Sequence, residues 1–196
     1  MPSDDWLVGG DRRAAAAERI YEAAIDMMAR SGINELDLDE LARRVHCSRS
    51  TIYRYVGGKT QIRDAVVARV ATRITTSVRS QVESMVGAER VTTAILATVR
   101  AIRSEPLCRL MIASIRGGTR EVAWLAQLPF LEESAAELAG LPRGNPAPAE
   151  WAVRVVLSLM YWPAESDEAE RQLVAKFVAP AFTRRDHSPY SSPKLS

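Results

Sequence analysis

Residues 45–59 read VHCSRSTIYRYVGGK, a polar turn followed by a run rich in arginine, tyrosine and hydroxyl side chains. Ser48 suits a helix N-cap, because its hydroxyl can accept a hydrogen bond from a backbone N–H one turn further on. Gly57 suits the cap at the other end, since glycine adopts a left-handed backbone without strain. The stretch therefore predicts a helix of about two turns, which is too short to be stable without a neighbour.

That neighbour is predicted directly upstream, where residues 36–45 read LDLDELARRV. Asp37, followed by Glu40, resembles a capping box at a helix N-terminus. The apolar stripe at helical spacing is formed by Leu38, Leu41, Ala42 and Val45. Two short helices joined by a tight turn make a helix-turn-helix, whose second helix can enter the major groove of DNA.

The second helix is expected to turn one face to the core and the other to solvent. Ile52 and Val56 are spaced one helical turn apart and are predicted to face the core. Arginine can read guanine edges, and hydroxyl groups can bind bases or phosphates. A solvated helix with stray charges is the alternative, but the cap, turn, core and donor positions all agree with DNA binding. The predicted DNA-binding residues are Arg43, Arg44, Ser48, Arg49, Ser50, Thr51, Tyr53, Arg54, Tyr55 and Lys59.

Roughly residues 14–66 resemble the DNA-binding region of the tetracycline-repressor (TetR) family of one-component regulators. Members typically have a first helix ending in glycine and a second helix with a central alanine. After the second helix, members carry the run Ser-Lys/Arg-Gly/Ser-Thr-Leu/Ile-Tyr-x-His/Tyr-Phe, which is followed by a lysine. The matching positions here are Gly32, Ala42, Ser48, Arg49, Ser50, Thr51, Ile52, Tyr53, Tyr55, Val56 and Lys59.

Two positions depart from the family pattern. His46 stands in the turn where glycine is usual, and Val56 replaces the usual phenylalanine. If the turn needs a positive φ, histidine is strained there, although less than most non-glycine residues. Valine leaves a smaller core beneath the helix. Neither change removes a DNA-facing donor, so we expect an altered helix tilt and an unaltered role.

The chain has 196 residues and a formal net charge of only +2, so total charge says little about its partners. The distribution of charge along the chain is more informative, because Asp64 is the one acid in the basic stretch from residue 41 to residue 79. A basic front half suits a DNA-binding face. Arg12 and Arg13 could add phosphate contacts or could be solvated terminal charges.

The sequence disfavours other classes of protein. Its two histidines, at positions 46 and 187, and the lack of a glycine-rich phosphate loop predict no enzyme, no catalytic residues and no cofactor. Cys47 and Cys108 lack CxxC spacing, which argues against a metal site and for a reducing compartment. We find no signal peptide and no apolar run of about 20 residues, so a cytoplasmic protein without a membrane partner is predicted.

The predicted fold class is all-α. A three-helix DNA-binding domain with a helix-turn-helix is expected over residues 1–60, with a flexible arm at 1–10. A helical ligand-binding and dimerisation domain is expected over 61–183, and a disordered tail over 184–196. One long helix at 58–85 is predicted to belong to both domains and to act as a lever.

The second domain is predicted to form a homodimer. Residues 151–162 read WAVRVVLSLMYW, so they lie either at the centre of a bundle or across a subunit interface. A two-fold dimer can place two recognition helices about one turn of DNA apart, which favours the interface over a monomer core. The TetR resemblance implies that residues 149–162 and 167–182 pair with their partner copies as a four-helix bundle.

The middle helices, at 88–140, are predicted to enclose a pocket for a small apolar effector, since few charges are available there. Taken alone, each candidate residue fits a plain core position better than a pocket wall. They are Met85, Leu96, Val99, Ile102, Leu107, Met111, Trp124, Leu128, Phe130, Leu131, Leu159 and Met160. The predicted function is a repressor that binds a palindromic double-stranded DNA operator as a dimer and is released by this effector. The alternatives are an activator and a helical interaction protein with a non-functional DNA-binding unit.

Overall fold

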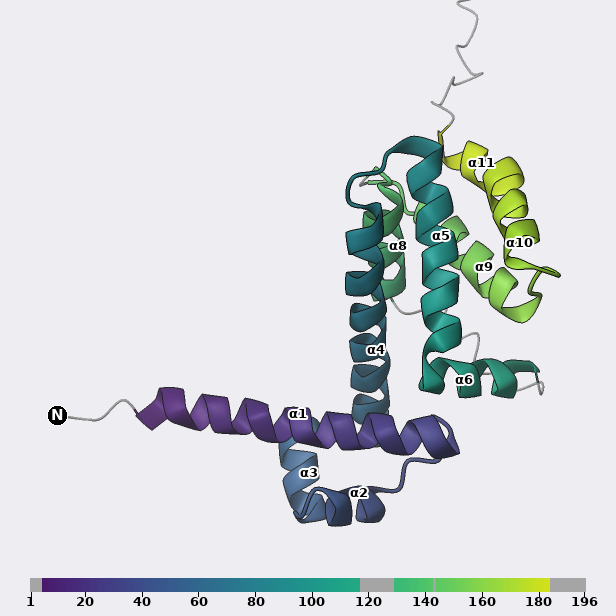
Figure 1. Ribbon diagram of the computed structural model, residues 1–196. Helices are drawn as coiled ribbons and strands as arrows, with labels where there is room; N and C mark the ends of the chain where they lie inside the picture. Colours follow the sequence, from purple (N-terminus) through teal and green to yellow (C-terminus); the bar gives the residue numbers. More distant parts are fainter. Residues whose placement is uncertain (1–4, 117–128, 143, 184–196) are drawn as a thin grey trace, which may run out of the picture. The chain divides into compact units, whose positions relative to one another are not determined.

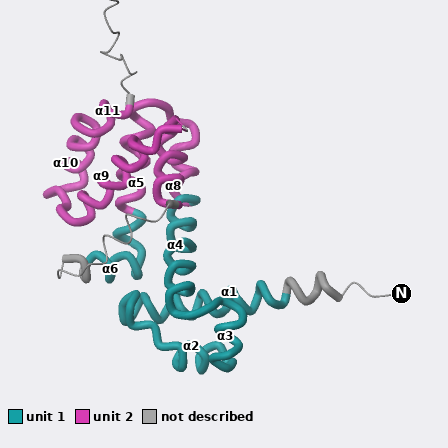
Figure 2. The backbone as a smooth tube through the Cα atoms, turned by 180° about the vertical axis from the view of Figure 1, so that it is seen from behind, with its two compact units in different colours: residues 1–76, 101–127 teal, residues 77–100, 128–196 magenta. Residues whose placement is uncertain are grey.

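The computed structural model describes residues 5–116, 129–142 and 144–183, and the regular secondary structure in these ranges is helical throughout (Figure 1). The all-α prediction is confirmed. The chain divides into two compact units, residues 1–76 with 101–127 and residues 77–100 with 128–196 (Figure 2). Two helices, α4 (Lys59–Val82) and α5 (Gly87–Ser104), each contribute residues to both units.

The first unit holds the helix-turn-helix. Its complete helices are α1 (Asp5–Ser31), α2 (Leu38–Arg44), α3 (Arg49–Val56) and α6 (Pro106–Arg116). Helix α1 packs against α2, α3 and α6, and α2 packs against α3. The buried apolar side chains of this unit include Ile20, Ala24, Met28, Leu38, Leu41, Ile52, Val56, Ile62, Val66 and Val70. The two short helices therefore gain their stability from a shared core with α1 and the start of α4.

Helix α1 begins earlier than the sequence suggested. A flexible arm was expected over residues 1–10, whereas α1 already begins at Asp5. The alanine run at 14–17 is strongly helix-forming, and extending an existing helix is easier than starting one. The other end is as predicted, because α1 stops at Ser31 and Gly32 takes a φ of 105°.

Arginine side chains of α4 form ion pairs and a cation–π contact with neighbouring helices of the first unit. The Arg69 guanidinium lies 3.7 Å from the centroid of the Tyr21 ring and pairs with Glu18 of α1. The two terminal nitrogens of Arg73 lie 3.9 Å from carboxylate oxygens of Glu22 and Glu105. The middle of α4 is thus held against α1, the helix that supports the helix-turn-helix.

The second unit contains α8 (Pro129–Ala139), α9 (Ala147–Tyr161), α10 (Asp167–Leu173) and α11 (Ala179–Thr183). A π-helical turn at Val174–Val178 joins α10 to α11, where the sequence predicted one continuous helix. Helix α8 packs on α9. Arg90 stabilises the end of α8 by donating from its Nε to the carbonyl of Leu138 (3.0 Å) and from its Nη2 to the carbonyl of Glu137 (2.8 Å). Residues 117–128, which fall within the region predicted to hold the middle helices, and the tail 184–196 lie outside the described residues.

Candidate nucleic-acid interface

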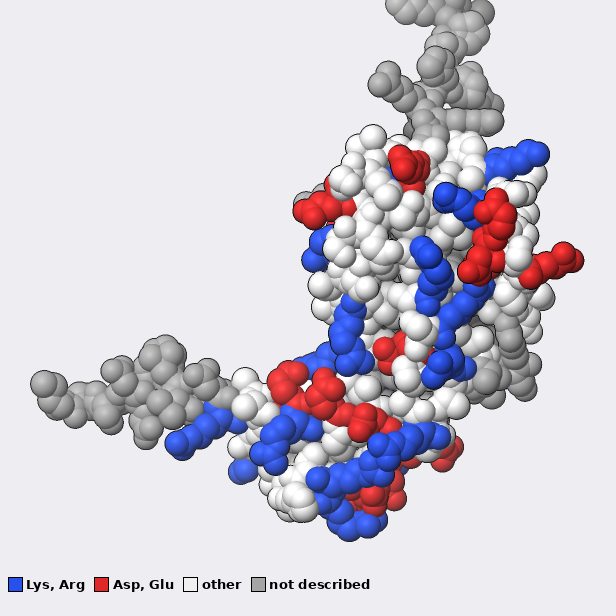
Figure 3. All heavy atoms as spheres, in the orientation of Figure 1, with Lys and Arg blue, Asp and Glu red and all other residues white. Residues whose placement is uncertain are grey.

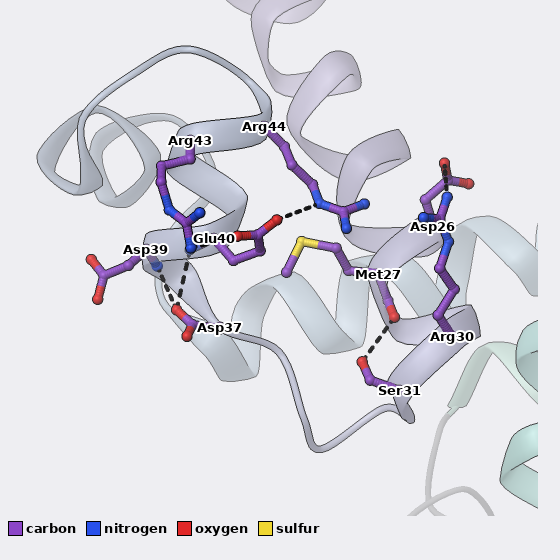
Figure 4. Close-up of polar contacts among 9 residues, drawn as sticks. All are labelled: Asp26, Met27, Arg30, Ser31, Asp37, Asp39, Glu40, Arg43 and Arg44. Carbon is purple, nitrogen blue, oxygen red and sulfur yellow. Dashed lines mark hydrogen bonds and ion pairs between the residues drawn. The ribbon is translucent and has the colours of Figure 1, made fainter.

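Asp37 caps the N-terminus of α2 (Figure 4). Its Oδ1 accepts from the backbone N–H groups of Asp39 at 2.7 Å and Glu40 at 3.2 Å. These two hydrogen bonds lower the pKa of Asp37 below its usual value. The Glu40 carboxylate is held by the arginines of the next turn, since its Oε1 accepts from Arg44 Nε at 2.9 Å and it pairs with Arg43. The N-cap at Asp37 is confirmed, but Glu40 does not complete the predicted capping box, because its carboxylate binds Arg43 and Arg44, two of the predicted DNA-binding arginines.

A Schellman motif closes the turn between α2 and α3. The backbone N–H of Cys47 donates to the carbonyl of Ala42 at 3.0 Å, and that of His46 donates to the carbonyl of Arg43 at 3.3 Å. His46 takes a φ of 55°, a conformation that no other non-glycine residue of the described ranges adopts. The turn therefore does need a positive φ at this position, and the strain is borne by histidine in place of glycine.

Helix α3 is capped and seated as the sequence predicted. Ser48 Oγ accepts from the backbone N–H of Thr51 at 3.2 Å and lies 2.8 Å from Ser50 Oγ. Ile52 and Val56 are buried, with 0% and 6% of their surface exposed. The side chains on the other faces are exposed or half-buried, and Tyr53 is 51% exposed. The donors predicted for DNA therefore lie on the outside of the unit.

Arg13 of α1 binds the last turn of α3. Its Nη2 donates to the backbone carbonyl of Arg54 at 3.1 Å, and its guanidinium lies 5.7 Å from the centroid of the Tyr55 ring. The guanidinium of Arg54 lies 5.2 Å from the same centroid. The sequence suggested phosphate contacts for Arg13, but it did not reveal this contact, which stabilises the C-terminal end of the recognition helix.

Arg49, the first residue of α3, is held by two neighbours. Its Nη1 lies 3.2 Å from Asp39 Oδ2 of α2, and Tyr53 follows one turn later on α3. A hydrogen bond with the Tyr53 side chain, followed by the charge of Asp39, raises the pKa of Arg49 above its usual value. Asp39 was missed by the sequence analysis, because the motif shows donors and not the acids that orient them.

Lys59 begins α4 and is exposed. Gly57, two residues before it, has a φ of 83°, and the backbone N–H of Gly58 donates to Gln61 Oε1 at 3.0 Å. A shallow concavity of about 420 Å³ lies beside these residues, and its lining includes Arg49 and Lys59 together with acidic residues of the segment before α2. The lining residues are Asn34, Glu35, Leu36, Asp37, Leu38, Asp39, Arg49 and Lys59.

The charges of the first unit are mixed and not uniformly basic. Figure 3 shows Lys and Arg side chains gathered over the helix-turn-helix, with Asp and Glu side chains among them. Several arginines there are paired with acids, as in Arg43 with Glu40 and Arg49 with Asp39. The surface therefore offers cations in fixed positions, which favours oriented contacts over a diffuse attraction to phosphate.

Residues 20–66 match the model of the bacterial regulatory proteins of the tetR family. The chain is 30% identical over 191 residues to the HTH-type transcriptional regulators Rv1255c and MT1294 of two Mycobacterium tuberculosis strains, and covers 93% of each. The chain belongs to the TetR family. The fold of this TetR-family chain is also similar to two solved structures. These are SCO7518 of Streptomyces coelicolor A3(2) (TM-score 0.63, 16% identity, covering 86% of this chain and 99% of that one) and the TetR-family repressor QsdR of R. erythropolis (TM-score 0.60, 22% identity, covering 89% and 98%).

The second unit of the TetR-family chain carries a group of exposed large apolar side chains. Trp151 and Trp162 of the α9 region are 49% and 70% exposed, and Leu173 and Phe177 of the last helices are 45% and 68% exposed. The ring centroids of Tyr161 and Trp162 lie 4.4 Å apart in an edge-on arrangement. These residues fall in the two segments predicted for dimerisation, and are called the α9–α10 apolar group below.

The residues predicted to line an effector pocket are distributed over both units. Ile102, Leu107 and Met111 belong to the first unit, and Met85, Leu96, Val99, Phe130, Leu131, Leu159 and Met160 belong to the second. Trp124 and Leu128 lie outside the described residues. Val99, Leu107, Met111 and Met160 are buried, and the others that are described are at least partly exposed. Within the described ranges no cluster of three metal-ligating side chains occurs, and no helix is long and apolar enough to cross a membrane.

Proposed function

We propose that this TetR-family regulator is a repressor that binds a palindromic operator as a homodimer. The single observation that supports this best is that α3 is held at both ends and on one face, while its polar side chains remain accessible. Both ends of the helix are hydrogen-bonded, its Ile52–Val56 face is buried, and its polar side chains are exposed or half-buried. A recognition helix needs this arrangement, because its outer side chains must reach base edges from a fixed backbone.

The α9–α10 apolar group supports the homodimer. Large apolar side chains that remain exposed in a group mark an interaction surface. Since a two-fold dimer uses the same patch on both copies, two such groups can cover each other, and the two α3 helices can then meet successive major grooves. The predicted interface at residues 149–162 and 167–182 contains every member of this group.

The experiment is a light-scattering measurement combined with a binding selection on random-sequence duplexes. The unmodified protein should be a dimer at micromolar concentration and should enrich a palindrome. Phe177→Asp should give a monomer with weaker operator binding. Val86→Asp is the matched control, because Val86 is 79% exposed in the turn before α5 and outside the α9–α10 apolar group. A monomeric unmodified protein, or two variants with equal effects, would contradict the proposed interface.

Release by a small apolar effector completes the proposal. Candidate wall residues in the second unit are Leu96, Leu131 and Leu159, which are partly buried, and Val99 and Met160, which are buried. Helix α4 belongs to both units, so a displacement at one end reaches the helix-turn-helix at the other. The ligand can shift operator affinity only by its differential affinity for the two states.

A panel of apolar small molecules, first screened for a rise in melting temperature, would test this proposal. Compounds that bind should lower operator affinity in a fluorescence-anisotropy titration. Binding without any change in operator affinity would contradict effector-driven release. An activator would enrich the same palindrome but raise transcription in a reconstituted assay. An interaction protein with a non-functional DNA-binding unit would enrich no palindrome at all.

A further inference from the structure

Asp39 is an acid on the surface that the proposed function presents to DNA. Its side chain is 65% exposed, and its Oδ2 lies 3.2 Å from Arg49 Nη1. An exposed ion pair of this kind contributes little to stability, because water screens both charges. An acid beside the phosphate backbone also opposes DNA binding. Its place in the first turn of α2 lets the carboxylate interact favourably with the helix dipole, which is a modest contribution to folding. General attraction to DNA does not account for an acid at this position.

We propose that Asp39 determines sequence specificity by fixing the guanidinium of Arg49 in the orientation that reads a guanine. This proposal rests on the proposed DNA-binding function and names the base that the site selects. Three points support this assignment. Arg49 keeps free donors for a base, Asp39 is held in position on α2, and a nearby carboxylate disfavours the phosphate contacts that compete with guanine.

Arg49 retains enough donors for a base after it binds Asp39. A guanidinium has five N–H groups, and Asp39 engages the Nη1 end only. The remaining donors can bind O6 and N7 of guanine together, which is the commonest specific contact in the major groove. Tyr53 follows one turn along α3, the spacing at which two side chains of one helix can contact each other.

Asp39 is itself held in place. It lies in the first turn of α2, and its backbone N–H donates to Asp37 Oδ1 at 2.7 Å. Arg49 is the first residue of α3, directly after the N-cap Ser48. The pair thus joins the capped N-termini of both helices of the helix-turn-helix, so the orientation of Arg49 follows the backbone of α2 and α3.

Phosphates compete with guanine for a free arginine. A phosphate contact carries no sequence information, and an unrestrained arginine can reach either partner. A carboxylate beside Arg49 makes the phosphate alternative less favourable by repulsion, while it leaves the donors for guanine in place. Removing the charge should therefore strengthen binding to arbitrary DNA and weaken discrimination at one base pair in each half-site.

The test uses the full-length protein and starts from the palindrome that the unmodified protein enriches. Anisotropy titrations then compare this palindrome with each single-base-pair variant and with an unrelated duplex. A bidentate arginine–guanine contact discriminates by about 5- to 150-fold. Arg49→Ala should abolish discrimination at one guanine of each half-site. Asp39→Asn should lower discrimination at the same guanine about fivefold or more, with equal or tighter binding to the unrelated duplex.

The matched control is Glu40→Gln, which removes the same charge from the neighbouring residue of α2. Its partners are Arg43 and Arg44, so base preference at the Arg49 position should be unchanged. The double variant Asp39→Asn/Arg49→Ala should discriminate no worse than Arg49→Ala alone, because the two residues act as one unit. Circular-dichroism melts should show that all variants fold.

Three results would overturn the proposal while leaving the DNA-binding function intact. Asp39→Asn could keep full discrimination, could lose it at a base pair insensitive to Arg49→Ala, or could match Glu40→Gln on every duplex. If the unmodified protein enriches no sequence, the proposed DNA-binding function itself fails, and the assignment of Asp39 fails with it.

Discussion

Replacing His46 with glycine should stabilise the protein slightly, although it removes a side chain. His46 occupies the left-handed position of the Schellman motif between α2 and α3, with a φ of 55°. Its side chain is exposed, so the substitution removes little packing. The change therefore isolates the backbone strain of one residue in the turn that sets the angle of the recognition helix.

Two opposing effects determine how much the substitution of His46 by glycine changes the free energy of unfolding. A left-handed conformation costs an L-residue about 1 kcal/mol or more, and histidine lies at the low end of this range. Glycine, in turn, raises the entropy of the unfolded chain, which offsets about 0.4–1 kcal/mol of that gain. We expect a net stabilisation of at most about 0.6 kcal/mol, which corresponds to a melting temperature higher by at most about 2 °C for a chain of this size.

Chemical denaturation and calorimetry of a short series would measure the effect. His46→Gly should be the most stable variant, His46→Ala should lie near or below the unmodified protein, and His46→Val should be the least stable, because a β-branched residue tolerates this φ worst. Gly32→Ala is the reverse control. Gly32 has a φ of 105°, and an added Cβ would come no closer than 4.0 Å to the Glu35 side chain, so no clash arises. Stability should fall, because the strain of alanine at this φ exceeds what is gained from the lower entropy of the unfolded chain.

The reasoning would be refuted if His46→Gly were as destabilising as His46→Val. That result would mean that the imidazole makes a contact whose stabilisation exceeds the backbone strain at this φ. Operator affinity should stay within about twofold in His46→Gly, because the hydrogen bonds of the motif involve backbone atoms only and a change of about 1.4 kcal/mol would be needed for tenfold.

Three further predictions follow from the caps and the cysteines. Ser48→Ala should destabilise the protein by about 1 kcal/mol in urea titrations, because it removes the cap of α3. The lowered pKa of Asp37 means that its contribution to stability is present above the usual value of 3.8 and is lost as pH falls through the folded-state pKa. The unmodified protein should therefore lose urea resistance more steeply below about pH 4 than Asp37→Asn, in which asparagine keeps the cap without the charge. Burial raises the pKa of Cys108 from 9.0 to about 12, so it holds about a thousandfold less thiolate than an unperturbed cysteine. Iodoacetamide at about pH 8 should alkylate Cys47 in the folded protein well before Cys108, and equal rates by peptide mass spectrometry would contradict this.

The features that the sequence predicted correctly depend on residues close together in the chain. The Asp37 and Ser48 caps, the positive φ of His46 and the buried pair Ile52 and Val56 each follow from a few neighbouring side chains. A cap needs a short polar side chain beside free N–H groups, and a left-handed turn restricts residue choice at one position. Such rules act within a single helical turn, so sequence spacing alone is enough to apply them.

The features that the sequence missed depend on where distant side chains meet. The Arg13 contact with the carbonyl of Arg54 spans 41 positions, and the pair of Arg49 with Asp39 spans 10. Both are made by long side chains whose rotamers are set by the packing of helices. The same limit applies to the predicted effector-binding residues. The hydrophobic effect is not directional, so a leucine in the core and a leucine that lines a pocket occur at the same spacing in the sequence.

The hydrogen bonding of α3 constrains how the proposed repressor can be released from DNA. Ser48 holds the N-terminal end, Arg13 binds the carbonyl of Arg54 in the last turn, and Ile52 lies at 0% exposure in the core. Deforming α3 itself would leave buried or capped groups without partners, which costs about 1–3 kcal/mol for each group. Moving the first unit as a whole breaks none of these bonds. An effector with a coupling free energy of about 1–3 kcal/mol can therefore change the separation of two recognition helices more readily than their internal structure. Base preference, which we propose is set by Arg49 and Asp39, should then remain the same in the effector-bound protein while its overall operator affinity falls.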